Sequence, residues 1–387
     1  MTRRIAVFTG TRAEYGLLYW VIKGLNESLH AELQLFVGGM HLSPEFGKTI
    51  CQIEADGIPV TAKLEFLLSS DTPVGIAKSM GLALISAADA FERTKPDLLM
   101  VLGDRFESLA ICQAAMVAQI PIAHIHGGET TEGLIDEAVR HSITKMSHLH
   151  FTATEEYRQR VIQLGEQPSK VFNVGAPGID NIKMLKLLSK DELSKSIGFD
   201  LNAAPYMVVT YHPVTLSKDG AVEDLKQLLV ALHEYPNHKF VISYPNADTH
   251  GRALIKLLDD FQRDMHDRVF LVQSLGQIRY LSALKFCDLV VGNSSSGLIE
   301  VPTFGVPTVN IGNRQKGRLA GETVVSCSGD RGSILRAIDE ALSKKFKKKC
   351  QNAKNPYGEG DSSSKILRTI LTEELDGLVF KSFFDMN

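Results

Sequence analysis

Short apolar runs alternate with helix-length segments along nearly the whole chain, and this alternation constrains the fold more than any other feature. The first half holds the runs Ile5–Gly10, Leu33–Gly38, Leu98–Gly103, Ile120–His126, Leu149–Thr154 and Val171–Gly175. Several are apolar at almost every position, which is typical of strands buried on both faces of a parallel sheet. The segments between them, such as Leu17–Leu29 and Gly75–Lys95, have the length and apolar spacing of helices. The pattern predicts repeated βαβ units.

A polar stretch at 189–204 interrupts this series, and a second series follows it. Its runs are Met207–Tyr211, Phe240–Tyr244, Val269–Val272, Leu289–Gly292 and Thr308–Ile311. A chain of 387 residues is also too long for one compact core. We therefore predict two Rossmann-like α/β domains, 1–180 and 200–361. A helix within 362–387 ends the second domain or packs back on the first. A cleft between the domains would receive a ligand at the carboxyl ends of the strands.

Composition excludes several classes of function. The formal net charge is −3, whereas a protein that wraps nucleic acid is normally basic. The mean hydropathy is −0.01 and no uninterrupted apolar run approaches a membrane span, so we expect no membrane partner. The first residues read as a strand, not a signal peptide. Five widely spaced cysteines without a CxxC pair favour reduced thiols in the cytoplasm, with no disulfide frame and no cysteine-built zinc site.

Unusual polar residues follow the predicted strands of the first domain. The turn Thr9–Gly16 contains Arg12 and precedes a helix that we expect to begin near Gly16, an arrangement suited to an anion. After the third run comes Gly103-Asp104-Arg105-Phe106-Glu107. A carboxylate just beyond a buried strand is placed for chemistry in a cleft. Asp104 and Glu107 also have the spacing of a helix capping box, and both interpretations can hold together.

The segment His124-Ile125-His126-Gly127-Gly128-Glu129 ends the fourth run. Residues i and i+2 of a strand share a face, so the two imidazoles would point the same way. A zinc site would need a third ligand such as Asp104, Asp136, His141 or His148, but no standard metal signature is completed, and we predict no metal. One of the two histidines is expected to be structural. The glycine pair would let the backbone approach a ligand closely.

A third acidic position opens the next predicted helix at Asp136, within the segment 136–141 (DEAVRH). Acidic residues in a first helical turn usually serve the helix dipole. This turn nevertheless follows the histidine loop after only a few residues, so it should face the same cavity. Asp104, His126 and Asp136 would then form a proton-transfer constellation.

The second domain offers groups suited to a pyrophosphate. His212 and Asn246 each follow a predicted strand, and the run Gly292-Asn293-Ser294-Ser295-Ser296-Gly297 joins a strand to a helix. Hydroxyls and a helix N-terminus would converge there on an anion without a metal. Glu300 would accept hydrogen bonds from ribose hydroxyls, and Arg314 would add positive charge. The alternative is a capped helix with an incidental acid.

Taken together, TGTRAEYG, GDRFE, HIHGGE, DEAVRH, YHP, GNSSSGLIEVP and INIGNRQKGR resemble the UDP-N-acetylglucosamine 2-epimerase family. Their order and spacing are similar to the hydrolysing branch of bacterial sialic-acid synthesis, over residues 5 to about 330. The resemblance implies a glycosyltransferase-B-like pair of Rossmann domains. It also implies hydrolysis of UDP-N-acetylglucosamine (UDP-GlcNAc) to N-acetylmannosamine and UDP. The same motifs resemble enzymes that act on UDP-N,N′-diacetylbacillosamine, and they do not separate the two substrates.

Family roles carry over onto matching positions. They assign catalytic roles to Asp104 and Asp136, with His126 at a position where animal enzymes have a carboxylate. The full candidate catalytic set is Asp104, His126, Asp136 and His212, and the candidate UDP-sugar contacts are Arg12, Arg105, Glu129, Asn246, Ser294, Ser295, Ser296, Gly297, Glu300 and Arg314. We expect no cofactor and a homo-oligomer, either a dimer or a tetramer.

The expected reaction is elimination of UDP to a 2-acetamidoglucal, followed by hydration. His126 and Asp136 both remain candidates for the final proton donor, because imidazole ionises near neutral pH. Three other functions stay open: a glycosyltransferase of the same fold, a non-hydrolysing 2-epimerase, and a non-catalytic UDP-sugar sensor.

Overall fold

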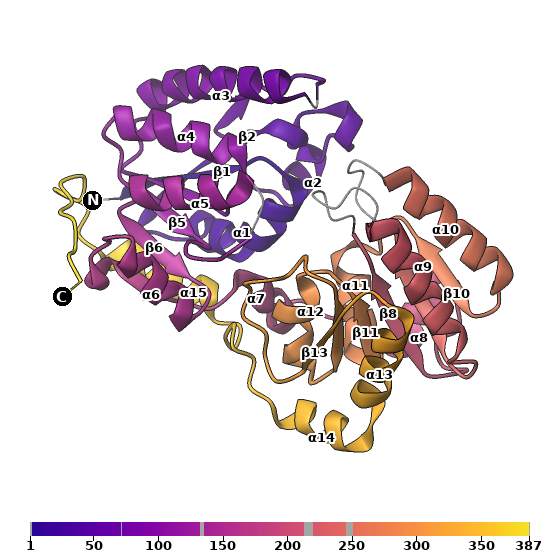
Figure 1. Cartoon of the computed structure of the whole chain (residues 1–387). Coiled ribbons are helices and arrows are strands. Elements are labelled where there is room, and N and C mark those ends of the chain that lie inside the picture. Colours follow the sequence, from indigo (N-terminus) through magenta and orange to yellow (C-terminus); the bar gives the residue numbers. More distant parts are fainter. Residues whose placement is uncertain (1, 71, 132–134, 213–219, 245–250, 387) are drawn as a thin grey trace. The chain divides into compact units, whose positions relative to one another are not determined.

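The computed structural model describes residues 2–70, 72–131, 135–212, 220–244 and 251–386. The chain divides into two compact units (Figure 1). The first comprises Met1–Asn181 together with Tyr357–Asn387, and the second comprises Ile182–Pro356. The first unit is therefore built from two separate stretches of the chain.

A seven-stranded sheet forms the centre of the first unit, in the order β3-β2-β1-β4-β5-β6-β7. Every neighbouring pair in it is parallel. The strands are β1 (Arg3–Thr9), β2 (Ala31–Gly38), β3 (Ala62–Leu64), β4 (Leu98–Leu102), β5 (Ile122–Ile125), β6 (Leu149–Thr152) and β7 (Val171–Asn173). From β1 the chain adds β2 and β3 on one side, and it then returns to add β4 to β7 on the other side. The switch point, where open α/β sheets bind ligands, therefore lies between β1 and β4.

Helices cover both faces of this sheet, and the alternation of side chains along β1 explains why. Ile5 and Val7 join one buried cluster with α1 and α15, whereas Ala6 and Phe8 join another with α3, α4 and α5. Both faces of a strand between two helical layers must be apolar. The helices of this unit are α1 (Arg12–Asn26), α2 (Ile50–Ala55), α3 (Pro73–Thr94), α4 (Phe106–Val117), α5 (Ile135–Met146), α6 (Glu155–Gln163), α7 (Pro177–Met184, which crosses into the second unit) and α15 (Ser362–Thr372).

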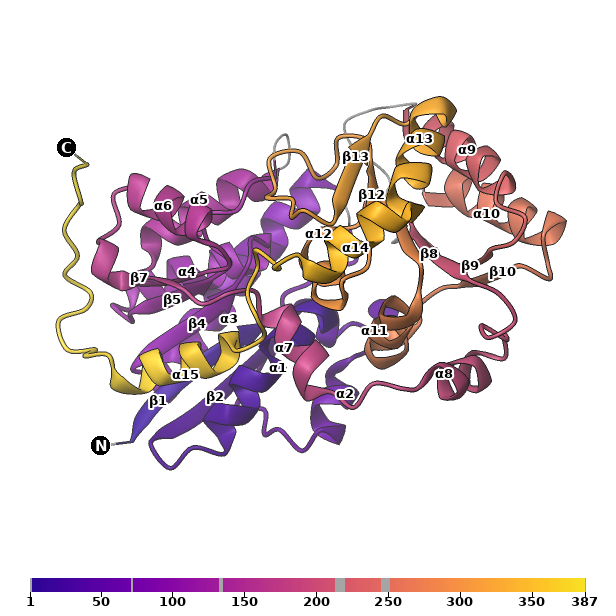
Figure 2. The same ribbon diagram turned by 90° about the horizontal axis from the view of Figure 1, so that it is seen from below.

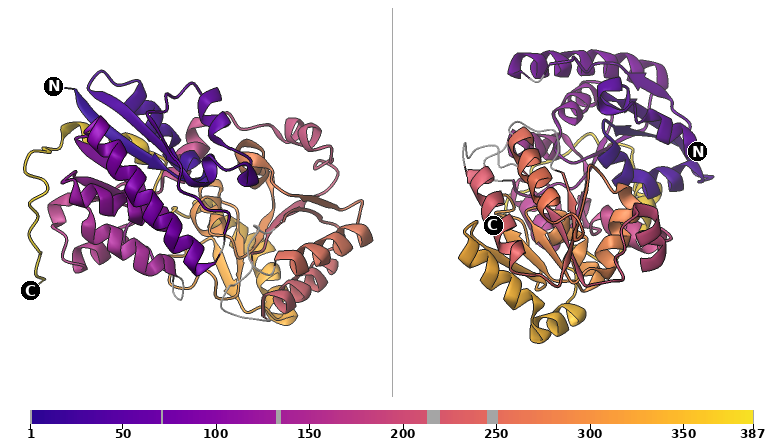
Figure 3. Two further views of the ribbon diagram at one scale, coloured as in Figure 1. Left: turned by 90° about the horizontal axis from the view of Figure 1, so that it is seen from above. Right: turned by 90° about the vertical axis from the view of Figure 1, so that its right-hand side faces the viewer.

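Helix α3 is long and apolar enough to cross a membrane by length and composition alone, with a mean hydropathy of 1.4 over its most apolar window. The sequence analysis missed this because small residues and a few polar ones interrupt the run. One face of α3, with Ala83, Ala87 and Phe91, packs in the core of the first unit (Figure 3, left). That packing accounts for one face of α3, whereas Leu82, Leu84 and Ile85 of the same helix are exposed.

The second unit repeats the same topology with a six-stranded parallel sheet, in the order β10-β9-β8-β11-β12-β13. Its strands are β8 (Tyr206–Thr210), β9 (Lys239–Ser243), β10 (Val269–Val272), β11 (Leu289–Gly292), β12 (Thr308–Ile311) and β13 (Val324–Cys327). Its helices are α8 (Lys190–Ile197), α9 (Gly220–His233), α10 (Gly251–Asp264), α11 (Gly276–Phe286), α12 (Ser296–Ile299), α13 (Arg331–Leu342) and α14 (Lys344–Asn352). Here the switch point lies between β8 and β11.

Residues 182–199, which the sequence analysis left between its two domains, belong to the second unit. Leu185, Leu188 and Leu193 pack there against α11. Beyond Pro356 the chain returns to the first unit, where α15 lies beside α1 (Figure 2). Both carboxylate oxygens of Asp180 accept hydrogen bonds at the start of α15, from the amides of Ser362 and Ser363 at 3.0 and 2.6 Å. The C-terminal helix is thus part of the first unit's core.

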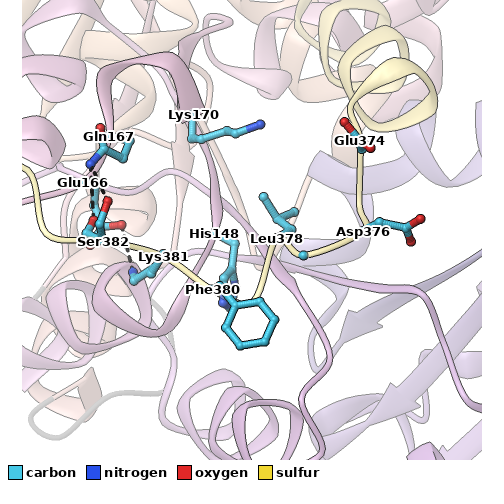
Figure 4. Close-up of a pocket in the computed structure, with 11 residues that line it drawn as sticks. His148, Glu166, Gln167, Lys170, Glu374, Asp376, Leu378, Phe380, Lys381 and Ser382 are labelled. Atoms are coloured by element: carbon cyan, nitrogen blue, oxygen red, sulfur yellow. Dashed lines mark hydrogen bonds and ion pairs between the residues drawn. The ribbon is translucent and has the colours of Figure 1, made fainter.

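The last residues hold the end of α5. The Lys381 ammonium donates to the carbonyl oxygens of Lys145 and Ser147 at 2.6 and 2.8 Å, and to the carboxylate of Glu166 at 2.8 Å. A cation is favourable at a helix C-terminus, where carbonyl groups lack partners within the helix. Figure 4 shows Lys381 and Glu166 beside a cavity of about 250 Å³ between the tail and the loops that flank β6 and β7.

Candidate active site

The predicted polar residues of the first unit gather at its switch point. The turn after β1 supplies Gly10, Arg12 and Glu14, and the turn after β4 supplies Asp104 and Arg105. Further residues come from the loop after β5 and the first turns of α5. Parallel strands end at one edge of a sheet, so these turns become neighbours in the fold.

Arg140 holds this cluster together, and the sequence analysis named it only as a letter in a motif. Its side chain is 1% exposed, and its guanidinium donates to Asp104, to Glu137 and to the hydroxyl of Thr131. A further bond runs to the carbonyl of Glu129 at 2.9 Å. Burial lowers the pKa of Arg140, but Asp104 and other acids outweigh burial and raise it. A buried, fully bonded cation of this kind orients the Asp104 carboxylate.

Asp136 stands four residues before Arg140 on α5, so both lie on one helix face. That spacing was the one signal in the sequence that could have singled out Arg140. Burial raises the pKa of Asp136, and the nearby Asp104 charge raises it further, against the opposing effects of Arg140 and Arg105. A carboxyl group with a raised pKa retains its proton more readily and can act as a general acid.

The two histidines of the fourth run differ in environment. His124 is fully buried on β5, and its Nε2 donates to the carbonyl of Gly103 at 2.7 Å. Its Nδ1 accepts from the Thr144 hydroxyl at 3.2 Å, and burial lowers its pKa to about 3. His124 is thus the satisfied structural histidine expected from the sequence.

His126 lies beyond the end of β5 and has a φ of 68°, so the strand alternation expected for the pair does not reach it. Left-handed backbone at a non-glycine residue is uncommon and often occurs at functional sites. The imidazole donates through Nδ1 to Glu129, whose carboxylate is buried. Glu129, a candidate substrate contact, is therefore placed to orient His126.

Helix α4 corrects the capping interpretation of Asp104. The helix begins at Phe106, its N-cap is Arg105, and no side-chain bond caps it. Glu107 instead accepts a hydrogen bond from Nε of Arg105 at 2.5 Å. Neither Asp104 nor Glu107 is engaged in a capping box, because Asp104 bonds Arg140 and Glu107 bonds Arg105.

The turn after β1 also differs from the expectation. Helix α1 begins at Arg12, not near Gly16, because Thr11 and Glu14 form a capping box. Exposed Arg12 is consequently the first residue of the helix. Its guanidinium extends from the end of the helix that carries the positive dipole.

In the second unit, Asn293 organises the switch point. Its side-chain oxygen accepts from the amide of His212 at 2.7 Å, and its amide group donates to the carbonyl of His212 at 2.9 Å. Burial lowers the pKa of His212 to about 4, and the charge of Arg314 adds to this effect. The imidazole is therefore neutral at physiological pH. Exposed Arg314 donates to the Asn293 carbonyl at 3.1 Å, so these three residues lie together.

The serine-rich turn leads into a shorter helix than expected. Helix α12 has four residues, and a 3-10 turn, Val301–Phe304, follows it. The amides of Gly297 and Leu298 already donate to the carbonyls of Ser294 and Ser295, at 3.2 and 3.0 Å. The turn therefore offers an anion the half-buried hydroxyls of Ser294 and Ser295 more than helix amides.

Ser296, Gly297 and Glu300, three further candidates, differ in their surroundings. Ser296 is buried, and Gly297 packs against Thr308, where a Cβ would lie 2.7 Å from a methyl carbon. Glu300 is close to the Tyr280 hydroxyl, whose pKa burial raises and Glu300 raises further. Asn246 lies outside the described residues. Among those residues, no group of three or more His, Cys, Asp or Glu side chains could hold a metal ion.

A family profile described as UDP-N-acetylglucosamine 2-epimerase matches residues 23–371. The chain belongs to this 2-epimerase family. The resemblance drawn from the motifs is thereby confirmed, and the match supports a UDP-sugar 2-epimerase activity.

Two curated relatives extend the match over almost the whole chain. One, from Campylobacter jejuni, is named GDP/UDP-N,N′-diacetylbacillosamine 2-epimerase (hydrolyzing); it is 38% identical over 385 residues, 99% of each chain. Another, the polysialic acid biosynthesis protein P7 of Escherichia coli, is 40% identical over 356 residues, 92% of this chain and 90% of that protein. Membership in the 2-epimerase family therefore rests on similarity along the full length.

A solved 2-epimerase structure has the same fold. It is the UDP-GlcNAc 2-epimerase from Neisseria meningitidis bound to UDP-GlcNAc, with a TM-score of 0.76 and 22% identity, over 96% of this chain and 100% of that one. The predicted glycosyltransferase-B-like pair of Rossmann domains is thus confirmed. In this 2-epimerase family member, Asp104 and Arg12 lie in the turns at the switch point of the first sheet, and His212 and Ser294 lie in those at the switch point of the second.

Proposed function

We propose that the protein is a hydrolysing 2-epimerase that converts a UDP-linked 2-acetamido sugar to UDP and the free C2-epimer. The observation that carries this proposal is the paired carboxylates of the first unit. Asp104 is bound by buried Arg140, and the nearby Asp136 has a raised pKa. Two acids in different protonation states can divide the work of base and acid.

The bond between carbon 1 of the sugar and UDP must break before the proton on carbon 2 is removed. The proton on carbon 2 is not next to a carbonyl group, so it is too weakly acidic for direct removal by a carboxylate. Departure of UDP leaves an oxocarbenium-like centre at carbon 1, and this centre acidifies the neighbouring C–H bond. Asp104, whose carboxylate is bound by the Arg140 guanidinium, would stabilise that centre and accept the proton. Loss of the proton gives the 2-acetamidoglucal.

Hydration of the glycal completes the reaction. Water adds to carbon 1 while a proton returns to carbon 2 on the opposite face, which inverts that carbon. Asp136 is the first candidate for this donor because burial favours its protonated form. His126, oriented by Glu129, is the other candidate. Hydrolysis and inversion then form one reaction without a redox cofactor.

The second unit would hold the nucleotide. Hydroxyls of Ser294 and Ser295 would bind the diphosphate, and Arg314 and Arg12 would add positive charge. Neutral His212 would donate a hydrogen bond to the departing phosphate. Glu300 would accept from the ribose hydroxyls.

For the sugar we propose UDP-N,N′-diacetylbacillosamine. The support is the 38% identical relative that acts on this sugar and matches 99% of both chains. A second candidate, UDP-GlcNAc, fits the same motifs equally well and is supported by the relative from polysialic acid biosynthesis. The Campylobacter relative is named for GDP- and UDP-linked substrates, so the nucleotide must also be tested.

Product analysis with purified protein tests the proposal. UDP-N,N′-diacetylbacillosamine, its GDP counterpart and UDP-GlcNAc are incubated separately in heavy water and followed by NMR. We expect free 2-epimer with deuterium at carbon 2, formed fastest from the first substrate. A nucleotide-linked epimer would indicate the non-hydrolysing reaction. No sugar release without an acceptor would favour a transferase, and binding of UDP without any product would favour a sensor.

A further inference from the structure

Two glutamates at the switch point of the first unit lie beneath the candidate catalytic groups and take no part in the chemistry above. Glu14 is on α1 and Glu107 is on α4, and both side chains are buried. Oε2 of Glu14 accepts from the amides of Gly10 and Thr11 at 2.8 and 3.0 Å. Oε1 of Glu107 accepts from Nε of Arg105 at 2.5 Å.

Both carboxyl groups flank the same glycine. Glu14 bonds the amide of Gly10, and a Cβ on Gly10 would lie 2.9 Å from Oε1 of Glu107. The outer oxygen of each group, Oε1 of Glu14 and Oε2 of Glu107, is buried and has no hydrogen-bond partner within the described part of the chain. An unpaired buried carboxylate oxygen is costly, and two ionised carboxylates at one site repel each other.

Arg105 does not neutralise both glutamates. Its guanidinium bonds Glu107, and it also interacts with the charges of Glu14 and Asp136. Buried His41 also lies close to the turn and bonds the hydroxyls of Thr9 and Thr49. Burial lowers the pKa of His41 to about 4, so it supplies no positive charge at neutral pH. Arg105 is thus shared by Glu107, Glu14 and Asp136, and Asp136 also interacts with Arg140.

We propose that Glu14 and Glu107 share one proton, carried by Glu14, so that the single remaining negative charge holds Arg105 in position beside Asp136. A proton on Glu14 removes the repulsion between two like charges and replaces a buried, unpaired carboxylate oxygen by a neutral hydroxyl, which costs less to bury. We place the proton on Glu14 and not on Glu107 because Glu107 accepts the charge-assisted hydrogen bond from Arg105. Glu14 and Glu107 are thus positioning residues for Arg105. The consequence for catalysis rests on the proposed function, whereas the shared proton does not.

Ionisation of Glu14 should lower the stability of the folded protein. Burial raises the pKa of Glu14 from 4.5 to about 8, and the charge of Glu107 adds to the rise. Across that interval the folded protein retains a proton that the unfolded chain has released. Stability from this group is therefore greatest at the acid end and falls as pH rises towards about 8. Replacement of Glu14 by glutamine removes this dependence.

The first test compares the melting temperatures of the wild type and Glu14→Gln between about pH 5 and pH 9. The only tryptophan, Trp20, is on α1, so its fluorescence reports unfolding of the first unit. We expect the melting temperature of wild type relative to the variant to fall as pH rises. Parallel curves would overturn the shared proton. This test needs no substrate, so it can succeed even if the proposed function fails.

A matched control exists in the second unit. Glu192 occupies the same third position of a capping box, with Ser189, at the start of α8, but it is exposed. Hydrogen bonds from Ser189 lower the pKa of Glu192. Circular dichroism gives the melting temperature of wild type relative to Glu192→Gln. This difference should not fall as pH rises, unlike the difference between wild type and Glu14→Gln. An identical trend would show that loss of a capping carboxylate alone explains the effect.

The second test separates the two glutamates by kinetics. Glu107→Gln should raise KM for the nucleotide sugar about tenfold, because Arg105 loses its charged partner. Glu14→Gln should extend activity to higher pH, since the pair no longer has a proton to lose. Equal effects of both variants on KM and on the pH profile would overturn the positioning role.

Infrared spectroscopy gives an answer even if Glu107→Gln does not fold. At neutral pH the difference spectrum between wild type and Glu14→Gln should contain the carbonyl stretch of one protonated carboxylic acid. Absence of that band would overturn the assignment of the proton to Glu14.

Discussion

The two switch points share one strand order and carry opposite chemistry. In the first unit the turn after β4 and the helices α4 and α5 present carboxylates and guanidinium groups that form ion pairs, each with one buried partner. In the second unit the turns after β8 and β11 present hydroxyls, an amide and an imidazole that stays neutral. The fold fixes where such groups meet, and the side chains decide what they can do there. We expect acid–base chemistry on one side and anion binding on the other.

Gly292→Ala tests the backbone of the second switch point and should have the largest effect. Gly292 has a φ of 141°, and a Cβ there would overlap the carbonyl of Thr210. Strain and overlap together should lower the free energy of unfolding by about 3 kcal/mol or more. Urea titration followed by circular dichroism should show an earlier transition. The Trp20 fluorescence transition, which reports the first unit, should stay unchanged; movement of both would show that the units are coupled.

Asp104→Asn tests the proposed acid–base role of the first switch point. Turnover should fall by a factor of about 100 or more, the usual range for one acid–base group. UDP affinity should change by less than about twofold, because Asp104 is not among the proposed nucleotide contacts. Steady-state kinetics and calorimetric titration with UDP measure the two quantities. Normal turnover in the variant would remove Asp104 from the catalytic set.

Ser295→Ala tests the proposed diphosphate site of the second unit, and here UDP affinity should change. Loss of one hydroxyl bond to the diphosphate should weaken UDP binding about tenfold, or ~1.4 kcal/mol. The melting temperature should be unchanged, because Ser295 is half-exposed and its side chain does not cap α12. Unaltered UDP affinity would place the diphosphate elsewhere.

Gly103→Ala should have the smallest effect and completes the comparison with Gly292. Gly103 follows β4 as Gly292 ends β11, and its φ is 78°, but a Cβ there would meet nothing within 4 Å. Only backbone strain remains, worth about 1 kcal/mol. A shift in the Trp20 transition as large as the Gly292→Ala shift in circular dichroism would contradict this account.

The central strands could be predicted from the sequence, because strands between two helical layers are apolar at nearly every position. Each predicted strand is present, with ends that differ by at most two residues. The edge strands β3 and β13 were missed, since they are short and partly exposed. Their sequences carry no continuous apolar run, so tertiary pairing decides their conformation.

The site was less predictable than the fold. The end of a predicted strand pointed to Asp104 and the start of a predicted helix pointed to Asp136. No local pattern shows that Arg140 is buried or that it bonds residues from two different turns as well as its own helix. The left-handed backbone of His126 was equally hidden, because strand periodicity continues through its position in the sequence. Long-range ion pairs and backbone reversals arise only when distant turns meet.

The division of the first unit into two stretches has a consequence for biosynthesis. Residues 182–356 are contiguous, so the second unit can fold as soon as it leaves the ribosome. The first unit instead needs Ile366 and Ile370 in its core and Lys381 at the end of α5, and these emerge only after the whole second unit. The amino-terminal stretch must therefore wait, with part of its apolar surface uncovered, until the residues beyond Pro356 have been synthesised.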